Sequence, residues 1–234
     1  HAIIRFGFQR WRLVFTIFFV YFGIHTLLSQ IETIYFNESL NIPVNEIVSF
    51  FLIGFITTAI FSPLAVIILG KFKKSEGAIH TPESLSKTKG ELFLKIALIA
   101  VVIYPVLYFC FGYFVLWQFP GAREFYSGST QKLPFFSHMG SLLKGDPWIY
   151  PWQVLRGLLW VGIALPVIRM SIAKRGETAV LVGLLFAVLM NAAHILPNPY
   201  MTKVVSLVHL LETATSNFIL GFVVTILLSR KRKK

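Results

Sequence analysis

The sequence predicts an all-α fold: a polytopic integral membrane protein whose spans form a six-helix transmembrane bundle. Of its 234 residues, 56% are hydrophobic and only 14% are charged, whereas about a quarter of the residues in ordinary soluble domains are charged. Several apolar runs reach the roughly 20 residues that a helix needs to cross the hydrocarbon core of a bilayer. The Lys and Arg residues gather between these runs. Together these observations exclude an ordinary soluble domain.

The six hydrophobic spans are predicted to form a single membrane domain covering residues 1–234. They lie at about residues 11–36, 46–70, 91–118, 152–169, 177–196 and 201–229. No span repeats another, and no low-complexity linker divides the chain. Pro63, Pro105 and Pro166 lie within spans, where a missing backbone donor favours a kink in the helix.

The basic residues predict that both termini are cytoplasmic. Four basic clusters flank the spans, at residues 5–12, 71–89, 169–175 and 230–234. Lys and Arg collect in cytoplasmic loops, and an even number of spans returns the chain to its starting side. The same clusters account for the net charge of +12 without a nucleic-acid partner. The expected partners are membrane lipids, with anionic head groups at the cytoplasmic face, and the expected location is the bacterial cytoplasmic membrane.

The longest connection, residues 119–151, is predicted to lie outside. It contains Trp, Tyr and Phe residues, which collect at membrane interfaces. Long connections of this kind are often lids over functional sites, and we interpret this one as a lid. His138 within it, like His80 in the second basic cluster, is expected to be solvated.

Six ionisable side chains within the spans mark a candidate site. They are His25, Glu32, Arg156, His194, His209 and Glu212. A charged group at membrane depth costs roughly 2.5–3.5 kcal/mol on insertion scales, so such groups are functional candidates by default. All six are predicted to lie in the half of the bundle nearer the outer face.

On four spans these groups and their polar neighbours recur at helical spacing. The sets are His25, Ser29 and Glu32; Gln153 and Arg156; Asn191, His194 and Asn198; and His209 and Glu212. Residues at such spacings share one helix face. In hydrocarbon a polar face must turn toward another polar face or toward water. We therefore expect a shared cavity open to the outer face, with a floor formed by His25, His209 and Glu212.

The first hypothesis for the chemistry is a metal site. His209 and Glu212 present an imidazole and a carboxylate from one helix, as in metal sites of helical bundles. His194, with His25 or Glu32 of the first span, would complete a nitrogen and oxygen ligand set suited to a divalent transition metal, either zinc, iron or manganese. Such an ion activates water for hydrolysis. Haem held by His25 and His209 is a further alternative.

The second hypothesis needs no metal. Glu212, His209 and Glu32 would act as catalytic acids and bases. Arg156, with Asn191 and Gln153, would bind the substrate, and the guanidinium of Arg156 would grip a phosphate or a carboxylate. On either hypothesis we expect a membrane-embedded enzyme, a hydrolase acting on a lipid or a lipid-linked substrate.

Two alternatives involve no chemistry. A transporter, or a non-catalytic subunit of a membrane-protein complex, would use the same polar cavity for binding. In the purely structural alternative, Arg156 pairs with Glu32 or Glu212, and the histidines and asparagines join helices through hydrogen bonds.

Overall fold

The computed structural model describes residues 7–72, 85, 88–196 and 199–229. The structure is 83% helical, and the described residues contain no β-strand. The all-helical prediction is therefore confirmed. Asn198, His80 and the basic residues at 230–234 lie outside the described residues, as does Arg5.

Five helical segments are long and apolar enough to cross a membrane. They are Arg10–Tyr35, Val44–Ile68, Lys89–Gln118, Ile149–Met170 and Lys203–Leu228. Their bounds lie close to the predicted ranges. The remaining predicted span, residues 177–196, corresponds to α10 (Arg175–Asn191) and a 3-10 turn (Ala192–Ile195). At 17 residues, α10 is about 26 Å long, just short of the roughly 30 Å hydrocarbon core.

Two of the long segments are interrupted by π-helical turns. The first consists of α1 (Arg10–Tyr21), a π-helical turn (Phe22–Leu28) and α2 (Ser29–Tyr35). The second consists of α5 (Lys89–Ala97), a π-helical turn (Leu98–Ile103), α6 (Tyr104–Phe114) and the 3-10 turn Leu116–Gln118. The segments α4 (Val44–Ile68), α9 (Ile149–Met170) and α11 (Lys203–Leu228) are continuous α-helices.

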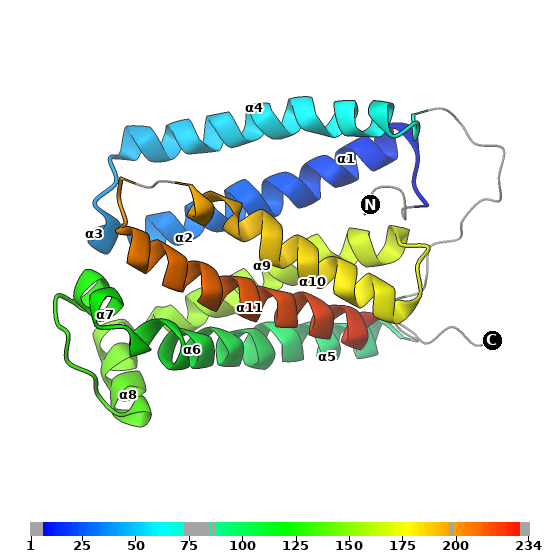
Figure 1. The fold of residues 1–234 in the computed structure, drawn as a ribbon. Helices are drawn as coiled ribbons and strands as arrows, with labels where there is room; N and C mark the ends of the chain where they lie inside the picture. The colour runs from blue at the N-terminus through cyan, green and yellow to red at the C-terminus, as the bar shows by residue number, and fades with distance from the viewer. Residues whose placement is uncertain (1–6, 73–84, 86–87, 197–198, 230–234) are drawn as a thin grey trace.

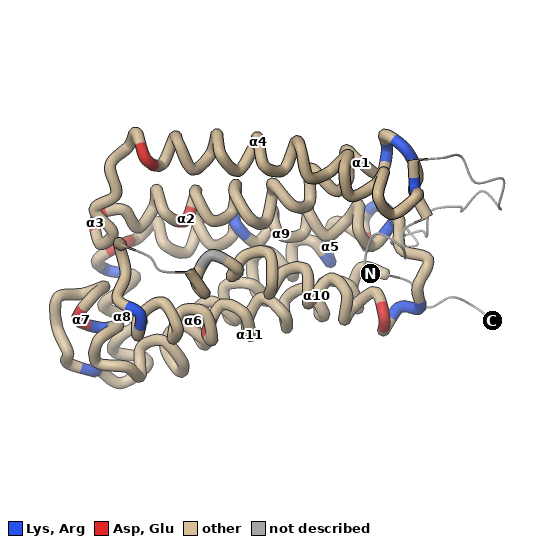
Figure 2. The backbone as a smooth tube through the Cα atoms, turned by 45° about the horizontal axis from the view of Figure 1, so that its top comes forward, with Lys and Arg blue, Asp and Glu red and all other residues tan. Residues whose placement is uncertain are grey.

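The long helices run back and forth between two ends of an elongated bundle (Figure 1). At one end α1 begins and α11 finishes. The other end carries the short helices α3 (Asn37–Leu40), α7 (Pro120–Ser127) and α8 (Phe135–Gly145). Lys, Arg, Asp and Glu lie mostly at these two ends, and few lie along the middle of the bundle (Figure 2).

The core lies where α9, α10 and α11 meet the first helix. Trp160 of α9 and Phe186 of α10 are fully buried, with ring centroids 4.3 Å apart. By contrast, α4 contacts α1, α2 and the π-helical turn between them, and its outward side chains Leu52, Ile53 and Ile60 are more than half exposed.

Candidate functional site

A cavity of about 700 Å³ lies at the end of the bundle that carries α3, α7 and α8. Its volume falls within the range typical of small-molecule sites. Much of its wall is apolar, with contributions from α4, α6 and α8 that include Phe50, Leu107, Phe109, Met139 and Leu142. Polar side chains of the wall come from α2, α9, the turn after α10 and α11, and also include Glu46 of α4.

One polar wall is an ion pair between α2 and α9. Arg156 Nη2 donates to Glu32 Oε2 at 2.5 Å, and Arg156 Nη1 donates to Gln153 Oε1 at 3.1 Å. The side chain of Arg156 is 4% exposed, whereas that of Glu32 keeps 17% of its surface exposed. Both terminal nitrogens of Arg156 thus have side-chain partners, whereas its buried Nε has none among the described residues. Glu32 is the more exposed member of the pair.

Two tyrosines of α6 complete the surroundings of the guanidinium. Its central carbon lies 5.8 Å from the ring centroid of Tyr104 and 6.0 Å from that of Tyr108, within the range of cation–π attraction. Both tyrosines line the cavity. Sequence reasoning missed them, because their spacing of four residues on an apolar helix does not distinguish them from the many other aromatic residues of the chain.

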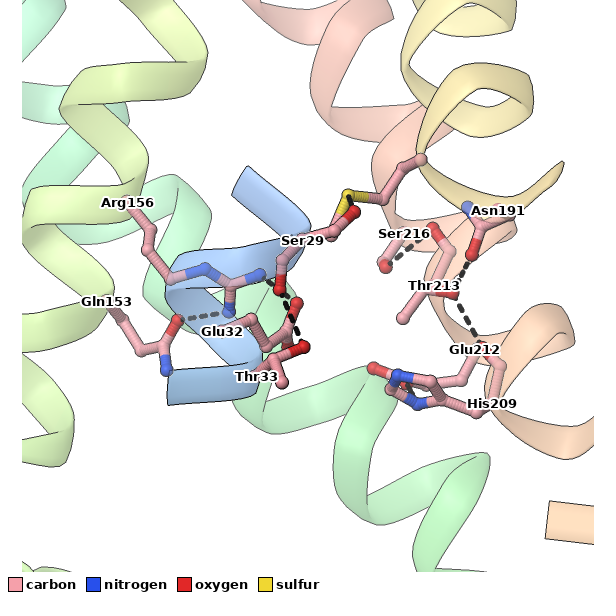
Figure 3. A network of polar contacts seen from close by, with 11 residues as sticks. Ser29, Glu32, Thr33, Gln153, Arg156, Asn191, His209, Glu212, Thr213 and Ser216 are labelled. Carbon is pink, nitrogen blue, oxygen red and sulfur yellow. Dashed lines mark hydrogen bonds and ion pairs between the residues drawn. The ribbon is translucent and has the colours of Figure 1, made fainter. Parts of the chain in front are cut away.

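The opposite polar wall is a His–Glu pair on α11. His209 Nδ1 lies 3.0 Å from Glu212 Oε2, and the Glu212 side chain is 5% exposed. The two residues are separated by three positions, so they share one helix face as the sequence predicts. In Figure 3 they lie across from Glu32 and Arg156, with the cavity between the two pairs.

His194 joins the His–Glu pair from the 3-10 turn after α10. Its ring stands edge-on to that of His209, with centroids 4.9 Å apart. Ser206 of α11 donates to the backbone carbonyl of His194 at 2.9 Å. This bond holds the turn against α11 and keeps the second imidazole at the cavity wall.

The predicted lid is a pair of helices rather than an irregular loop. Tyr126 of α7 and His138 of α8 line the cavity, and the Tyr126 ring centroid lies 6.4 Å from that of His209. Buried Arg123 ties the segment together, donating from Nε to the Thr130 carbonyl at 2.7 Å and from Nη1 to the Trp117 carbonyl at 2.6 Å.

Two titratable groups of the lid are shifted by burial. Burial raises the pKa of Tyr126 above its usual range, so its phenol stays protonated. Burial lowers the pKa of His138, which favours its neutral form. The His138 ring packs 4.6 Å from Trp117, centroid to centroid. The expectation that His138 is a solvated loop residue is therefore wrong.

Three predicted site residues are absent from the cavity wall. Gln153 stands behind Arg156. Asn191 stands behind Thr213, because its Nδ2 donates to the Ala187 carbonyl at 2.8 Å while its Oδ1 accepts from the Thr213 hydroxyl. His25 Nδ1 lies 3.0 Å from the Leu189 carbonyl. None of the three is among the described residues that line the cavity.

The π-helical turn explains why His25 is separated from Glu32. A π-helix closes its hydrogen bonds over five residues rather than four, so residues on its two sides are rotated relative to an uninterrupted α-helix. His25 lies within this turn. The spacing that would place it on the face of Ser29 and Glu32 in a regular helix therefore does not hold here.

The predicted metal ligands come together only in part. Within the described part of the chain, no three His, Cys, Asp or Glu side chains are grouped so that they could hold a metal ion. His194, His209 and Glu212 are neighbours in pairs, and His25 is directed to a backbone carbonyl. Metal binding by this set, and haem binding by His25 and His209, stay predictions.

In chemical terms, the cavity joins an apolar chamber to two facing pairs of ionisable groups. In one pair, Arg156 donates a hydrogen bond to Glu32; in the other, His209 Nδ1 and Glu212 Oε2 lie 3.0 Å apart without hydrogen-bond geometry. No protein-family model, curated protein or solved structure matches this chain. The cavity itself is therefore what indicates the function of the protein.

Proposed function

We propose that this protein is a membrane-embedded hydrolase that cleaves a lipid or lipid-linked substrate within the cavity. The observation that carries the proposal is the His209–Glu212 pair, with Nδ1 and Oε2 3.0 Å apart, at the wall of a chamber that is otherwise largely apolar. An apolar chamber suits the hydrocarbon part of a lipid, and a His–carboxylate pair suits proton transfer to and from a reacting group.

The proposal includes a position in the membrane. The five long apolar helices, together with α10, would form six spans with both termini in the cytoplasm. The exposed apolar side chains of α4 would then contact lipid. The end of the bundle that carries α7 and α8 would lie outside, so that the cavity opens away from the cytoplasm of a bacterial cell.

The proposed chemistry is general acid–base hydrolysis. His209 takes a proton from a water molecule as the water oxygen forms a bond to the substrate carbonyl carbon. The protonated imidazole then gives that proton to the leaving oxygen or nitrogen as its bond to carbon breaks. Glu212 Oε2, 3.0 Å from Nδ1, would stabilise the protonated ring by its charge, as a carboxylate does in hydrolytic triads.

Glu32 supplies a second polar contact. Arg156 holds one of its carboxylate oxygens, and the exposed part of the side chain is placed to accept a hydrogen bond from a substrate hydroxyl. In the described structure His194, His209 and Glu212 are not grouped closely enough to hold a metal ion, so a metal-dependent form would require these side chains to move together; the metal would then supply activated water.

The test is hydrolysis of a fluorogenic palmitoyl ester by purified protein in lipid nanodiscs. Replacing Glu212 with Gln, or His209 with Gln, should lower kcat by at least about 100-fold, the usual contribution of general acid–base catalysis. Glu124→Gln is the matched control, because Glu124 lies exposed on α7 and outside the cavity wall. The control should keep wild-type activity, and all three variants should keep the wild-type Tm.

Three results separate the alternatives. Full activity in both cavity variants would refute the role of the His–Glu pair. Tight binding of the ester without hydrolysis by the wild type would refute the enzyme and leave a transporter or a non-catalytic binding subunit. Stoichiometric zinc, iron or manganese in the purified protein, lost together with activity on chelation, would establish the metal-dependent form.

A further inference from the structure

The charged side chains that line the cavity are unequal in sign. Besides the histidines, they are Glu32, Glu46 and Glu212 against the single guanidinium of Arg156, among the described residues. Glu32 accepts from Arg156 at 2.5 Å, so these two charges largely cancel. The wall then retains two carboxylates, one deep on α11 and one at the start of α4.

Among the residues that the structure describes, neither remaining carboxylate has a permanent cation beside it. Glu212 is within ion-pair distance of His209, which is the only basic partner that the described residues give it. Together the imidazole and the carboxylate carry no net positive charge, so this pair offers no cation to an anionic ligand. Glu46 accepts a hydrogen bond from the hydroxyl of Tyr200, a neutral donor.

Other cations near this end of the bundle are held outside the cavity. The guanidinium of Arg123 is bound to the carbonyls of Trp117 and Thr130. Lys132 donates to Gln118 Oε1 at 2.9 Å. Neither side chain is part of the described cavity wall. The polar groups of the chamber therefore present a net negative charge to whatever enters it.

We infer that the cavity selects amphiphiles whose polar end carries no negative charge, so that the substrate is an uncharged acyl ester or amide rather than a phosphate- or carboxylate-bearing lipid. That the ligand is a substrate rests on the proposed function. The selectivity against negative charge rests on the charges of the cavity wall. Like charges a few ångströms apart repel strongly at the low effective dielectric of a buried site, and a buried anion needs a partner that Arg156, already paired, does not supply.

The inference also changes the role expected of Arg156. From the sequence alone, its guanidinium is predicted to bind an anionic group of the substrate. In the structure both terminal nitrogens have side-chain partners. We therefore assign Arg156 a positioning role, in which it holds Glu32 toward the chamber.

The test is equilibrium binding of three amphiphiles with the same hexadecyl chain to the full-length protein in phosphatidylcholine nanodiscs at neutral pH. They are the neutral hexadecylglycerol ether, its anionic phosphate monoester and the cationic hexadecylamine. Because none contains a carboxylic ester or a carboxamide, the proposed acyl hydrolysis cannot occur and binding is measured without turnover. The neutral and cationic ligands should bind at least about tenfold more tightly than the phosphate.

Two variants assign this difference to the cavity. Ser216→Phe places a large ring at a residue that lines the chamber and should remove the binding of the neutral ether. Any binding that remains in this variant takes place outside the cavity and is subtracted for each ligand. Glu212→Gln keeps the shape of the side chain, removes one negative charge and should narrow the gap between the neutral and anionic ligands by at least about threefold.

A phosphate ligand that binds as tightly as the neutral ether would overturn the inference. So would binding of the neutral ether that Ser216→Phe leaves intact, because the ligand would then sit elsewhere. The hydrolase proposal is judged separately. Selective binding without hydrolysis of the palmitoyl ester would retain the charge preference and refute the enzyme, whereas hydrolysis combined with unselective binding would do the reverse.

Discussion

At the residue scale, Arg156 shows how a buried charge is accommodated in this chain. Four side chains from three helices surround it: Glu32 of α2, Gln153 of α9, and Tyr104 and Tyr108 of α6. Removing the guanidinium alone would leave the Glu32 carboxylate without its cation in a largely apolar setting. Losing one partner of a buried ion pair is costly for this reason, even where the intact pair adds little net stability.

Arg156→Met should therefore destabilise the protein by about 3–5 kcal/mol. The matched control is Lys95→Met, which breaks a pair with Glu91 whose Nζ–Oε1 distance is 2.7 Å but whose side chains are 27% and 38% exposed. An exposed pair of this kind contributes at most about 1 kcal/mol. Both changes are measured by reversible denaturation in detergent micelles.

A second variant tests the cause of the loss. Adding Glu32→Leu to Arg156→Met removes the orphaned carboxylate, so the double variant should recover part of the lost stability. A double variant that is no more stable than Arg156→Met, or equal losses in Arg156→Met and Lys95→Met, would show that the buried ion pair does not carry the stability assigned to it.

At the scale of elements, α10 and α11 approach so closely that glycine is required on both. A Cβ built on Gly183 would lie 2.8 Å from the backbone oxygen of Phe218, and a Cβ on Gly221 would lie 2.8 Å from that of Val182. Small residues permit such backbone approach between helices in membranes. This approach matters for the site, because α11 carries His209 and Glu212 and the turn after α10 carries His194.

Gly183→Ala should destabilise the protein by about 1–3 kcal/mol, the usual cost of overpacking, since the contact is with backbone that cannot rotate away. Gly162→Ala in α9 is the control, because a Cβ at Gly162 meets nothing within 4 Å. That change should be neutral or slightly stabilising through helix propensity. Thermal unfolding of both variants checks this, and an equal Tm would mean that the close approach is not needed.

At the scale of the whole molecule, the two ends of the bundle differ in what they carry. The end with α7 and α8 holds the cavity. The other end holds the start of α1 and the end of α11, and basic Lys174 directly precedes α10. The proposed orientation places these ends on opposite sides of a bilayer, and it follows from the preference of Lys and Arg for the cytoplasmic side.

Labelling with a membrane-impermeant maleimide tests this orientation. In a background in which Cys110 is replaced by Ser, a cysteine at exposed Ser129, between α7 and α8, should react in intact bacterial spheroplasts. A cysteine at exposed Lys174, between α9 and α10, should react only after the cells are opened. The opposite pattern would place the cavity on the cytoplasmic side.

The sequence by itself determined the all-helical class and the positions of the long helices, because apolar runs of bilayer length leave the backbone no partner but itself. It also determined that His209 and Glu212 lie on the same helix face, since both belong to an uninterrupted α-helix and are three positions apart. For the same reason, the polar turn of α9 that holds Gln153 and Arg156 could be identified from spacing alone.

Only the tertiary structure decided which of these groups meet. The π-helical turn at Phe22–Leu28 breaks the periodicity from which His25 was placed beside Glu32, and no pattern of residue types marks that turn. The choice of Glu32 over Glu212 as partner of Arg156, and the tyrosines around the guanidinium, depend on how three helices pack. Packing between helices is set by side-chain shapes across the interface, which the periodicity of any single helix does not contain.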